Sequence, residues 1–557
     1  MHNPFHRQKS KDSANSRGTV NSINKDTVRH YTTLLKWFHE LEQTDPTQDK
    51  CYLLLAEQRY GLWLELLRDW AGEPDDIPIP PIDVAYIWHA HMISPVKYMQ
   101  DVQRLAPAAN ILQYAMPLQR LHAVYENGKT PEAMSVRYWE KHTQLPYLLT
   151  PLGDSSYLAR CPWCTTKFTL AWPTIIALRG QVLPDAPVTC PSCHAPWDRD
   201  VVSGHQFWSD VQAYLYGPTR TPLAGALVDP GTSTLQPELA HRDLDRLFQG
   251  LSETKVSRLV SDWKACQWCF ITRAFDEVQQ RLAKTTTKEK VRTTTVDQMF
   301  AAYREIVTPT SLDLCGAVLR QRTFIHAMQT VHWSYPVSLL KSVRYYRRFI
   351  GLVVLYPDSS LIPTLNVDLV WQTHLMHPQV YSDYTVHTLG RYVDHDNYHP
   401  EEMVGMQFMA TAAYWRRRYR SPFTLKDLQK QCQHSWRIAA SIACPPFGVH
   451  NFRKYFHLET IMRHLALLNP HRSTRAKGPS PIPVNVWDCR YLGASVSRIP
   501  PDWVDLDAGY GYSVAGAHQS SQYPGWGRLP INSTHSMNLG SEYRAKLEEM
   551  QLGIEAH

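Results

Sequence analysis

This chain of 557 residues lacks most of the short motifs that assign a protein a reaction. It has no glycine-rich phosphate loop, no Gly-x-Ser-x-Gly elbow and no His-Glu-x-x-His segment. No stretch approaches 18 uninterrupted apolar residues, so we expect no membrane-spanning helix. The polar amino terminus also lacks the apolar core of a signal peptide. These absences favour a cytoplasmic, or else nuclear, protein whose thiols stay reduced.

Charge of one sign is also scarce. The net charge of +7 is spread over the whole chain, which by itself is too mild to indicate a nucleic-acid-binding protein. Hydrophobic residues make up 43% and charged residues 20%, the ordinary balance of a soluble globular protein. Tryptophan and tyrosine are plentiful, with 18 and 29 copies, and we expect them to form large, rigid core contacts.

One stretch of sequence occurs twice, as Pro80–Tyr98 and again as Pro363–Tyr381. The Asp or Asn near each start is predicted to cap a short helix, the Trp and His lie on one side of that helix, and the second Pro starts another helix. Each copy therefore predicts a helix, a tight turn and a helix. The signature residues are Asp83, Trp88, His91, Pro95 and Tyr98 in the first copy, and Asn366, Asp368, Trp371, His374, Pro378 and Tyr381 in the second.

The similarity between the two copies continues downstream. The first copy has Tyr138-Trp139, six residues and then Pro146-Tyr147, and the second has Tyr414-Trp415, six residues and then Pro422-Phe423. We therefore predict a mainly α-helical fold with two homologous helical domains, an inserted zinc-ribbon-like module and disordered termini. The expected organisation is a basic disordered tail (1–27), the first repeat domain (28–150), the ribbon (155–200), a connecting helical region (205–299), the second repeat domain (300–440), trailing helices (441–468), and a Pro/Gly/Ser-rich tail with a short terminal helix (469–557).

These motifs resemble the glycine-rich domain-containing protein family of plants and fungi. Its hallmark is an Asp-Val-Asp-Leu-Val-Trp-His-Thr-His-like stretch followed by Pro and Tyr, and each copy here keeps part of it. The first copy has Ala85 in place of the second Asp, and the second copy has Asn366 and Gln372 as departures. Gly390–Asp396 is similar to another family segment. The resemblance implies a regulator of stress and hormone responses with no established enzymatic chemistry.

Four of the eleven cysteines form two Cys-x-x-Cys pairs that are separated by 25 residues. Two thiolates three residues apart can close on one ion, and four thiolates satisfy tetrahedral zinc. The spacing therefore predicts a structural zinc ion that stabilises a module with almost no apolar core; His194 as a substitute for one thiolate is an alternative. The predicted ligands are Cys161, Cys164, Cys190 and Cys193.

A third pair, Cys266 and Cys269, has no partner pair nearby. It lies in a predicted amphipathic helix over Val256–Leu282, because the apolar residues there recur with helical periodicity. We expect two buried core thiols at these positions, and a second metal site is the alternative.

Histidines are dense in the second copy, where a mixture of His and carboxylates suits a divalent metal. This makes a metal-dependent enzyme an alternative, with candidate catalytic residues His374, Asp394, His395 and Asp396. Against it, the first copy keeps His91 without an Asp-His-Asp segment. We expect His91 and His374 to be semi-buried, each bonded to a carbonyl or carboxylate and packed under its Trp, with a ligand pocket as the remaining interpretation.

The interpretation that these features favour is an intracellular regulatory or scaffolding protein, not an enzyme, that binds protein partners through its helical repeats. A second alternative is a nucleic-acid-associated factor that uses the ribbon and the run Arg416–Arg418 with Arg420. The explanation that we favour for this run is a solvated helix end that complements the helix dipole.

Overall fold

The computed structural model describes residues 23–423 except 150–155, 180–187, 230–233, 236, 284–292, 305, 330–332, 334–335, 357–358, 360, 396–400 and 422. The predicted trailing helices and C-terminal tail lie outside these described residues. The chain forms two compact units, described separately below. Of the described residues, unit 1 takes in those up to Arg322 and those from Gln372 to His395, and unit 2 takes in those from Thr323 to Trp371 and those from Glu401 onward.

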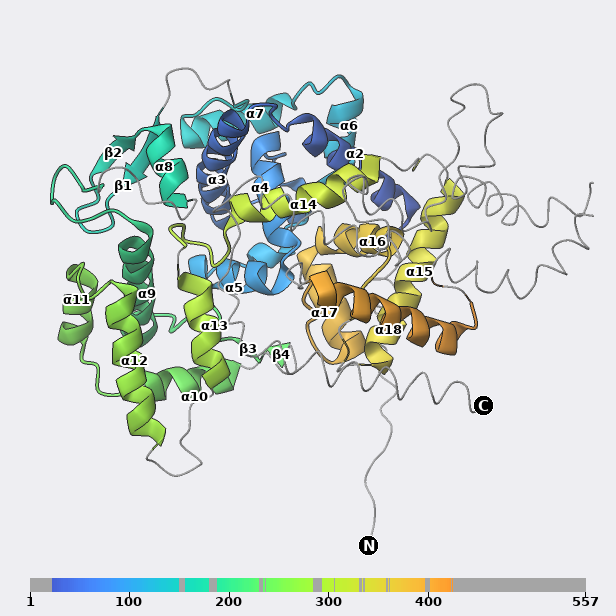
Figure 1. Ribbon diagram of the computed structural model, residues 1–557. Helices are drawn as coiled ribbons and strands as arrows, with labels where there is room; N and C mark the ends of the chain where they lie inside the picture. Colours follow the sequence, from blue (N-terminus) through green and yellow to red (C-terminus); the bar gives the residue numbers. More distant parts are fainter. Residues whose placement is uncertain are drawn as a thin grey trace, which may run out of the picture. The chain divides into compact units, whose positions relative to one another are not determined.

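Unit 1 begins with a group of helices in which α2 packs on α6 and α3 packs on α4 (Figure 1). Asn24 caps α2 by accepting hydrogen bonds from the backbone N–H groups of Asp26 and Thr27, so the helix begins inside the segment expected to be a disordered tail. The elements are α2 (Lys25–Glu40), α3 (Pro46–Arg68), η2 (Pro74–Asp76), α4 (Ile82–Met92), α5 (Pro95–Leu105), η3 (Ile111–Gln113), α6 (Leu118–Glu126) and α7 (Ala133–Thr143).

The predicted helix–turn–helix is formed by α4 and α5, and α4 is buried on almost every side. A helix that is apolar all round belongs in a protein core. The expected cap at Asp83 is wrong, because Pro81 occupies the N-cap position and Asp83 lies in the first turn. There Asp83 accepts a 2.6 Å bond from Arg59 of α3. Its carboxylate therefore neutralises a buried arginine instead of capping the helix.

The inserted module follows as an antiparallel hairpin of β1 (Tyr157–Arg160) and β2 (Lys167–Leu170), in which Tyr157 faces Leu170, and then α8 (Trp172–Arg179). Arg179 at the end of α8 is buried and donates to Glu57 of α3 at 2.7 Å, which ties the module to the first helices. A buried arginine requires such a partner, because desolvating the charge alone is costly.

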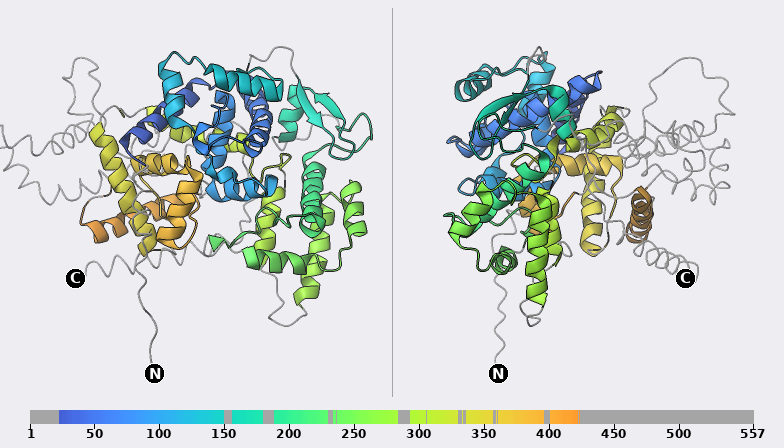
Figure 2. Two further views of the ribbon diagram at one scale, coloured as in Figure 1. Left: turned by 180° about the vertical axis from the view of Figure 1, so that it is seen from behind. Right: turned by 60° about the vertical axis from the view of Figure 1, so that its left-hand side comes forward.

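The connecting region has its own aromatic core around Phe207, whose ring contacts Trp208, Trp268, Phe275, Phe300 and Tyr303. Helix α9 packs against α11, α12 and α13 (Figure 1, Figure 2). The elements are α9 (Arg199–Tyr216), β3 (Val228–Asp229), β4 (Thr234–Leu235), α10 (Pro237–Leu247), α11 (Glu253–Ser261), α12 (Trp268–Ala283) and α13 (Thr293–Tyr303).

The single helix predicted over Val256–Leu282 is wrong, since α11 ends at Ser261 and α12 begins at Trp268. The turn between them brings the carbonyl oxygen of Cys266 within 1.7 Å of where a Cβ on Gly204 would lie, so only glycine fits in α9 there. Cys266 is buried in the aromatic core as expected, whereas Cys269 is exposed, which corrects the expectation of two buried thiols.

The second copy of the repeat is formed by α16 (Leu365–Leu375) and α17 (Pro378–Leu389). Gln372 to the end of α17 belongs to unit 1, and the start of α16 belongs to unit 2. Asn366, like Asp83, lies in the first turn of its helix and is no cap. Unit 2 also contains α15 (Pro336–Leu355), α18 (Glu401–Tyr419) and the end of α14 (Leu314–Gln329). No helix of the described residues is long and apolar enough to span a membrane.

Candidate metal centre and the repeat histidines

The sulfur atoms of the two Cys-x-x-Cys pairs meet at one point. All four Sγ atoms lie within 4.8 Å of one another; Cys161 and Cys193 are 3.6 Å apart, and Cys164 and Cys190 are 3.4 Å apart. Tetrahedral zinc with Zn–S bonds of about 2.3 Å places its sulfurs roughly 3.8 Å apart. The four cysteines therefore have the spacing and the chemistry of a closed, four-thiolate metal site.

The same backbone turn builds both cysteine pairs. The N–H of Thr165 donates to the carbonyl of Cys161 at 3.0 Å, and the N–H of His194 donates to that of Cys190 at 3.0 Å. Both donor residues have positive φ, 59° and 58°. His194 is thus the exposed turning residue of the second pair, and among the described residues its ring does not join the four sulfurs.

The four thiols differ in proton affinity. The Thr166 hydroxyl, 3.3 Å from Sγ of Cys164, lowers the pKa of that thiol to about 6. Burial raises the pKa of Cys161 to about 12. A divalent metal binds thiolates, so loading this centre requires protons to leave the more basic thiols.

Every signature residue of the two repeats is buried. His91 is 0% exposed, with Nδ1 2.9 Å from the hydroxyl of Tyr60 and Nε2 3.1 Å from the carboxylate of Asp101. The expected carboxylate partner is thus present. The His91 ring meets Tyr98 edge-on, with centroids 5.0 Å apart, and Trp88 donates its Nε1–H to the Tyr98 hydroxyl at 3.0 Å.

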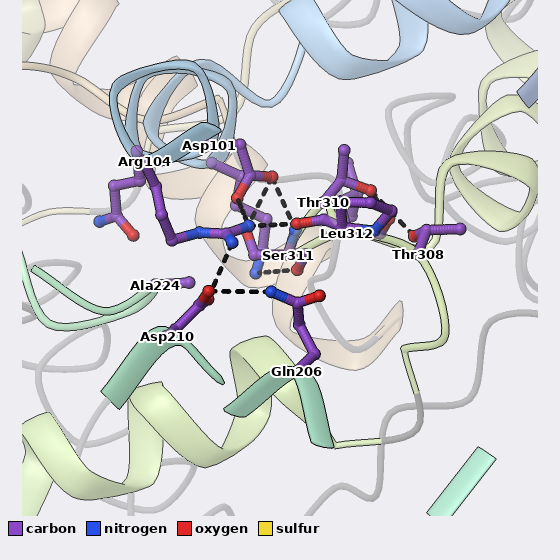
Figure 3. Close-up of polar contacts among 12 residues, drawn as sticks. Asp101, Arg104, Gln206, Asp210, Ala224, Thr308, Thr310, Ser311 and Leu312 are labelled. Carbon is purple, nitrogen blue, oxygen red and sulfur yellow. Dashed lines mark hydrogen bonds and ion pairs between the residues drawn. The ribbon is translucent and has the colours of Figure 1, made fainter. Parts of the chain in front are cut away.

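Asp101 connects the His91 site to a wider buried network, drawn in Figure 3. Its carboxylate accepts from the backbone N–H of Ser311 at 2.7 Å and from Arg104 at 3.1 Å. Arg104 also donates to Asp210 of α9 at 2.8 Å, and Asp210 accepts from Tyr303 at 2.6 Å. The end of the first hairpin is therefore fastened to the connecting region by alternating charges.

The second histidine repeats the aromatic contact, but the residue that corresponds to Asp101 is not a carboxylate. His374 is 1% exposed and meets Tyr381 edge-on at 5.1 Å and 88°, against 5.0 Å and 87° for His91 and Tyr98. The position of Asp101, three residues beyond the tyrosine, is held by Tyr384, whose ring lies 5.3 Å from His374. Burial lowers the pKa of His374 to about 3, so the ring is neutral at physiological pH.

The other candidate catalytic residues lie apart from any described metal-ligand cluster. Asp394 is exposed and accepts from the backbone N–H of His395, while Nδ1 of His395 is 3.1 Å from the carbonyl of Ile93. Asp396 lies outside the described residues. Among the residues that the structure describes, no cluster of converging metal-ligand atoms contains His374, Asp394 or His395.

Sequence reasoning missed Asp101, Arg104 and Asp210. A weak signal for Asp101 exists, because it follows Tyr98 by three residues and so shares a helix face with it. Nothing in the spacing of Asp210 points to the same network.

Comparison with known proteins finds a family match for the two repeats but not for the four-cysteine module between them. The glycine-rich domain-containing protein-like family matches residues 2–101 and 263–384, which include both hairpins, whereas the four cysteines lie between the matches. Glycine-rich domain-containing proteins 1 and 2 of Arabidopsis thaliana are 32% and 29% identical over 114 residues. The match covers 19% of this chain and only 14% of the length of each relative. No solved structure matches the chain. Both copies of the repeated stretch are therefore similar to the glycine-rich domain-containing protein-like family, whose model covers less than half of this chain.

Proposed function

We propose that this chain is a regulatory or scaffolding protein that binds protein partners through its helical repeats, with a structural zinc ion in the module between them. The observation that carries the proposal is the burial of His91 and His374, which are 0% and 1% exposed. A catalytic or ligand-binding histidine must reach its substrate. These two rings instead hold the hairpins together, so the repeats serve as a rigid framework for contacts.

The four-thiolate geometry supports a structural role for the metal. Four protein ligands close a tetrahedral zinc site, whereas a catalytic zinc keeps one position open. The ion would join the β1–β2 hairpin, which carries Cys161 and Cys164, to the turn that carries Cys190 and Cys193. The indole of Trp163, between the first two cysteines, donates to the carbonyl of Val260 at 3.0 Å. Zinc would therefore also secure the contact between the module and the connecting region.

Large exposed apolar side chains at and beyond α7 support a partner surface on the first repeat domain. Met134 is 53% exposed at the start of the helix, and Leu145 and Leu148, just past its end, are 38% and 56% exposed. Exposed apolar surface of this kind is typical of protein contact sites when it is contiguous.

The test is affinity capture with the full chain and two matched variants. Leu145→Ser with Leu148→Ser removes the apolar side chains beyond α7, and Leu158→Ser with Phe270→Ser makes the same chemical change at exposed positions elsewhere. We expect the first variant to lose captured proteins that the wild type and the second variant retain. Identical sets of proteins from all three chains would contradict a partner surface at this place.

A further inference from the structure

Two helices of unit 2 present a surface rich in arginine. The residues of α15 recur three and four positions apart, so they lie along one side of that helix, and the α18 residues occupy its last turn and the position just beyond. Most of these side chains are exposed. We call the set the arginine face: Lys341, Arg344, Arg347 and Arg348 from α15, and Arg416, Arg417, Arg418 and Arg420 from α18 and its end.

Acidic residues are scarce in the two helices that carry the arginine face. α15 contains no Asp or Glu, and the two carboxylates of α18 belong to Glu401 and Glu402 at its start. Arg416 lies fourteen positions beyond Glu402, which is roughly 21 Å along the helix axis. Within the described part of the chain, no carboxylate pairs with Arg344, Arg417 or Arg420. The helix dipole explains arginines at the end of α18 but not those in the middle of α15.

Arginines and tyrosines alternate in a stack across the two helices. The guanidinium of Arg348 lies 5.7 Å from the ring of Tyr345 and 5.2 Å from the ring of Tyr419, and the guanidinium of Arg418 lies 5.5 Å from the same Tyr419 ring. Tyr345 in turn stacks on buried Trp415 at 4.9 Å. The Tyr419 hydroxyl donates to the carbonyl of Arg348 at 2.7 Å, which joins α18 to α15.

This stack prepares the guanidinium groups for a particular kind of ligand. A ring that holds a guanidinium by a cation–π contact leaves the N–H edge available for a phosphate. The bases of single-stranded nucleic acids stack on guanidinium planes and on aromatic rings, because their faces are not already stacked inside a duplex. Phosphate contacts and stacking positions thus alternate at this surface.

We propose that the arginine face binds single-stranded nucleic acid, with arginines on the phosphates and bases stacked against the Arg348–Tyr419 ladder. An acidic membrane surface is the competing ligand, but the exposed aliphatic residues of α15 are Leu340, Val354 and Leu355. They lie toward the two ends of the helix, so the arginine segment between them offers a bilayer no apolar anchor. This proposal is independent of the partner-binding role proposed above.

The test is fluorescence anisotropy of the full chain with a labelled oligouridine of about 12 nucleotides, a length within the usual site size, over a series of salt concentrations. Each phosphate contact contributes about −0.7 to the slope of log K against log salt for a single strand. We expect Arg348→Ala with Arg418→Ala to weaken binding about tenfold and to make the slope less steep by about 1.4. Arg348→Lys with Arg418→Lys should keep the salt slope but lose affinity, because the lysine ammonium keeps the charge and lacks the planar face of a guanidinium.

The matched control is Arg68→Ala with Arg220→Ala, which removes two exposed arginines of unit 1 that pair with Asp69 and Asp245. It should bind like the wild type. If the stacked pair proves necessary for folding, Arg344→Gln with Arg417→Gln and Arg420→Gln tests the same face through residues without described partners. No binding by the wild type, or equal losses in control and face variants, would overturn the proposal. So would arginine-dependent binding to phosphatidylserine vesicles without binding to the oligouridine.

Discussion

His89 and Gln372 hold the same position in the two copies of the repeat, and both bond the hydroxyl of Tyr31. The Tyr31 hydroxyl donates to Oε1 of Gln372 at 2.8 Å and lies 2.6 Å from Nε2 of His89, so His89 supplies the hydrogen of the second bond. Gln321 donates to the same Oε1 at 2.6 Å. Within unit 1 the two hairpins are therefore joined through equivalent residues, as expected for a duplicated element.

The first prediction concerns the pH dependence of stability. Burial lowers the pKa of both His89 and His374 to about 3, whereas an unfolded histidine titrates near about 6.5. The unfolded state therefore binds more protons between these values. The stability that these histidines contribute is therefore fully present above about pH 6.5. It is lost as the pH is lowered, by about 1.4 kcal/mol per pH unit for each histidine.

His89→Gln tests this relationship, because glutamine does not titrate and is the residue of the second copy. We expect urea unfolding at several pH values to show a slope of free energy against pH reduced by about one proton between about pH 6 and 4. An unchanged slope would show that His89 is protonated in the folded state.

The second prediction concerns Asp101. Burial would raise the pKa of this carboxyl group, but the His91 hydrogen bond and the Arg104 charge outweigh it and leave the pKa lowered. Asp101→Asn removes one of the two carboxylates that balance buried Arg104, the other being Asp210. Loss of the sole partner of a buried charge costs about 3–5 kcal/mol, so we expect a loss of up to that size. Thermal or urea unfolding measures the loss. Asp69→Asn, which breaks an exposed pair with Arg68, is the control and should leave stability almost unchanged.

The third prediction concerns an exchange between the copies. In the first copy Arg59 pairs with Asp83 and lies over Trp139 at 4.7 Å. In the second copy, Asn366 replaces Asp83, and Tyr345 stacks on the tryptophan that corresponds to Trp139. In the second copy, an amide thus stands in place of the carboxylate, and the aromatic ring of Tyr345 lies on the equivalent tryptophan.

A double-mutant cycle with Arg59→Met and Asp83→Asn tests this coupling. Each single change leaves a buried charge alone and should cost about 3 kcal/mol or more, whereas the double variant should recover at least about 1 kcal/mol of the summed loss. Additive losses would mean that the two charges do not depend on each other.

The sequence predicts what depends on local spacing. The identical spacing within Pro80–Tyr98 and Pro363–Tyr381 predicts both hairpins, and two Cys-x-x-Cys pairs predict the four-sulfur cluster. The predicted cap at Asp83 is wrong, because its carboxylate finds a better partner in Arg59.

Contacts between distant segments are not visible in local spacing. The bonds from Ser311 to Asp101 join residues 210 positions apart, and the pairing of Arg104 with Asp210 depends on how α9 packs. The different burial of Cys266 and Cys269 follows from the turn between α11 and α12, which helical periodicity does not reveal.

The most direct test of the account is the zinc content of the purified full chain, measured by elemental analysis together with that of two variants. We expect one zinc ion per chain in the wild type and in Cys266→Ser, which alters a thiol of the aromatic core, and loss of the ion in Cys161→Ser. A wild-type chain without zinc, or a Cys161→Ser chain that keeps a full equivalent, would contradict the four-thiolate centre.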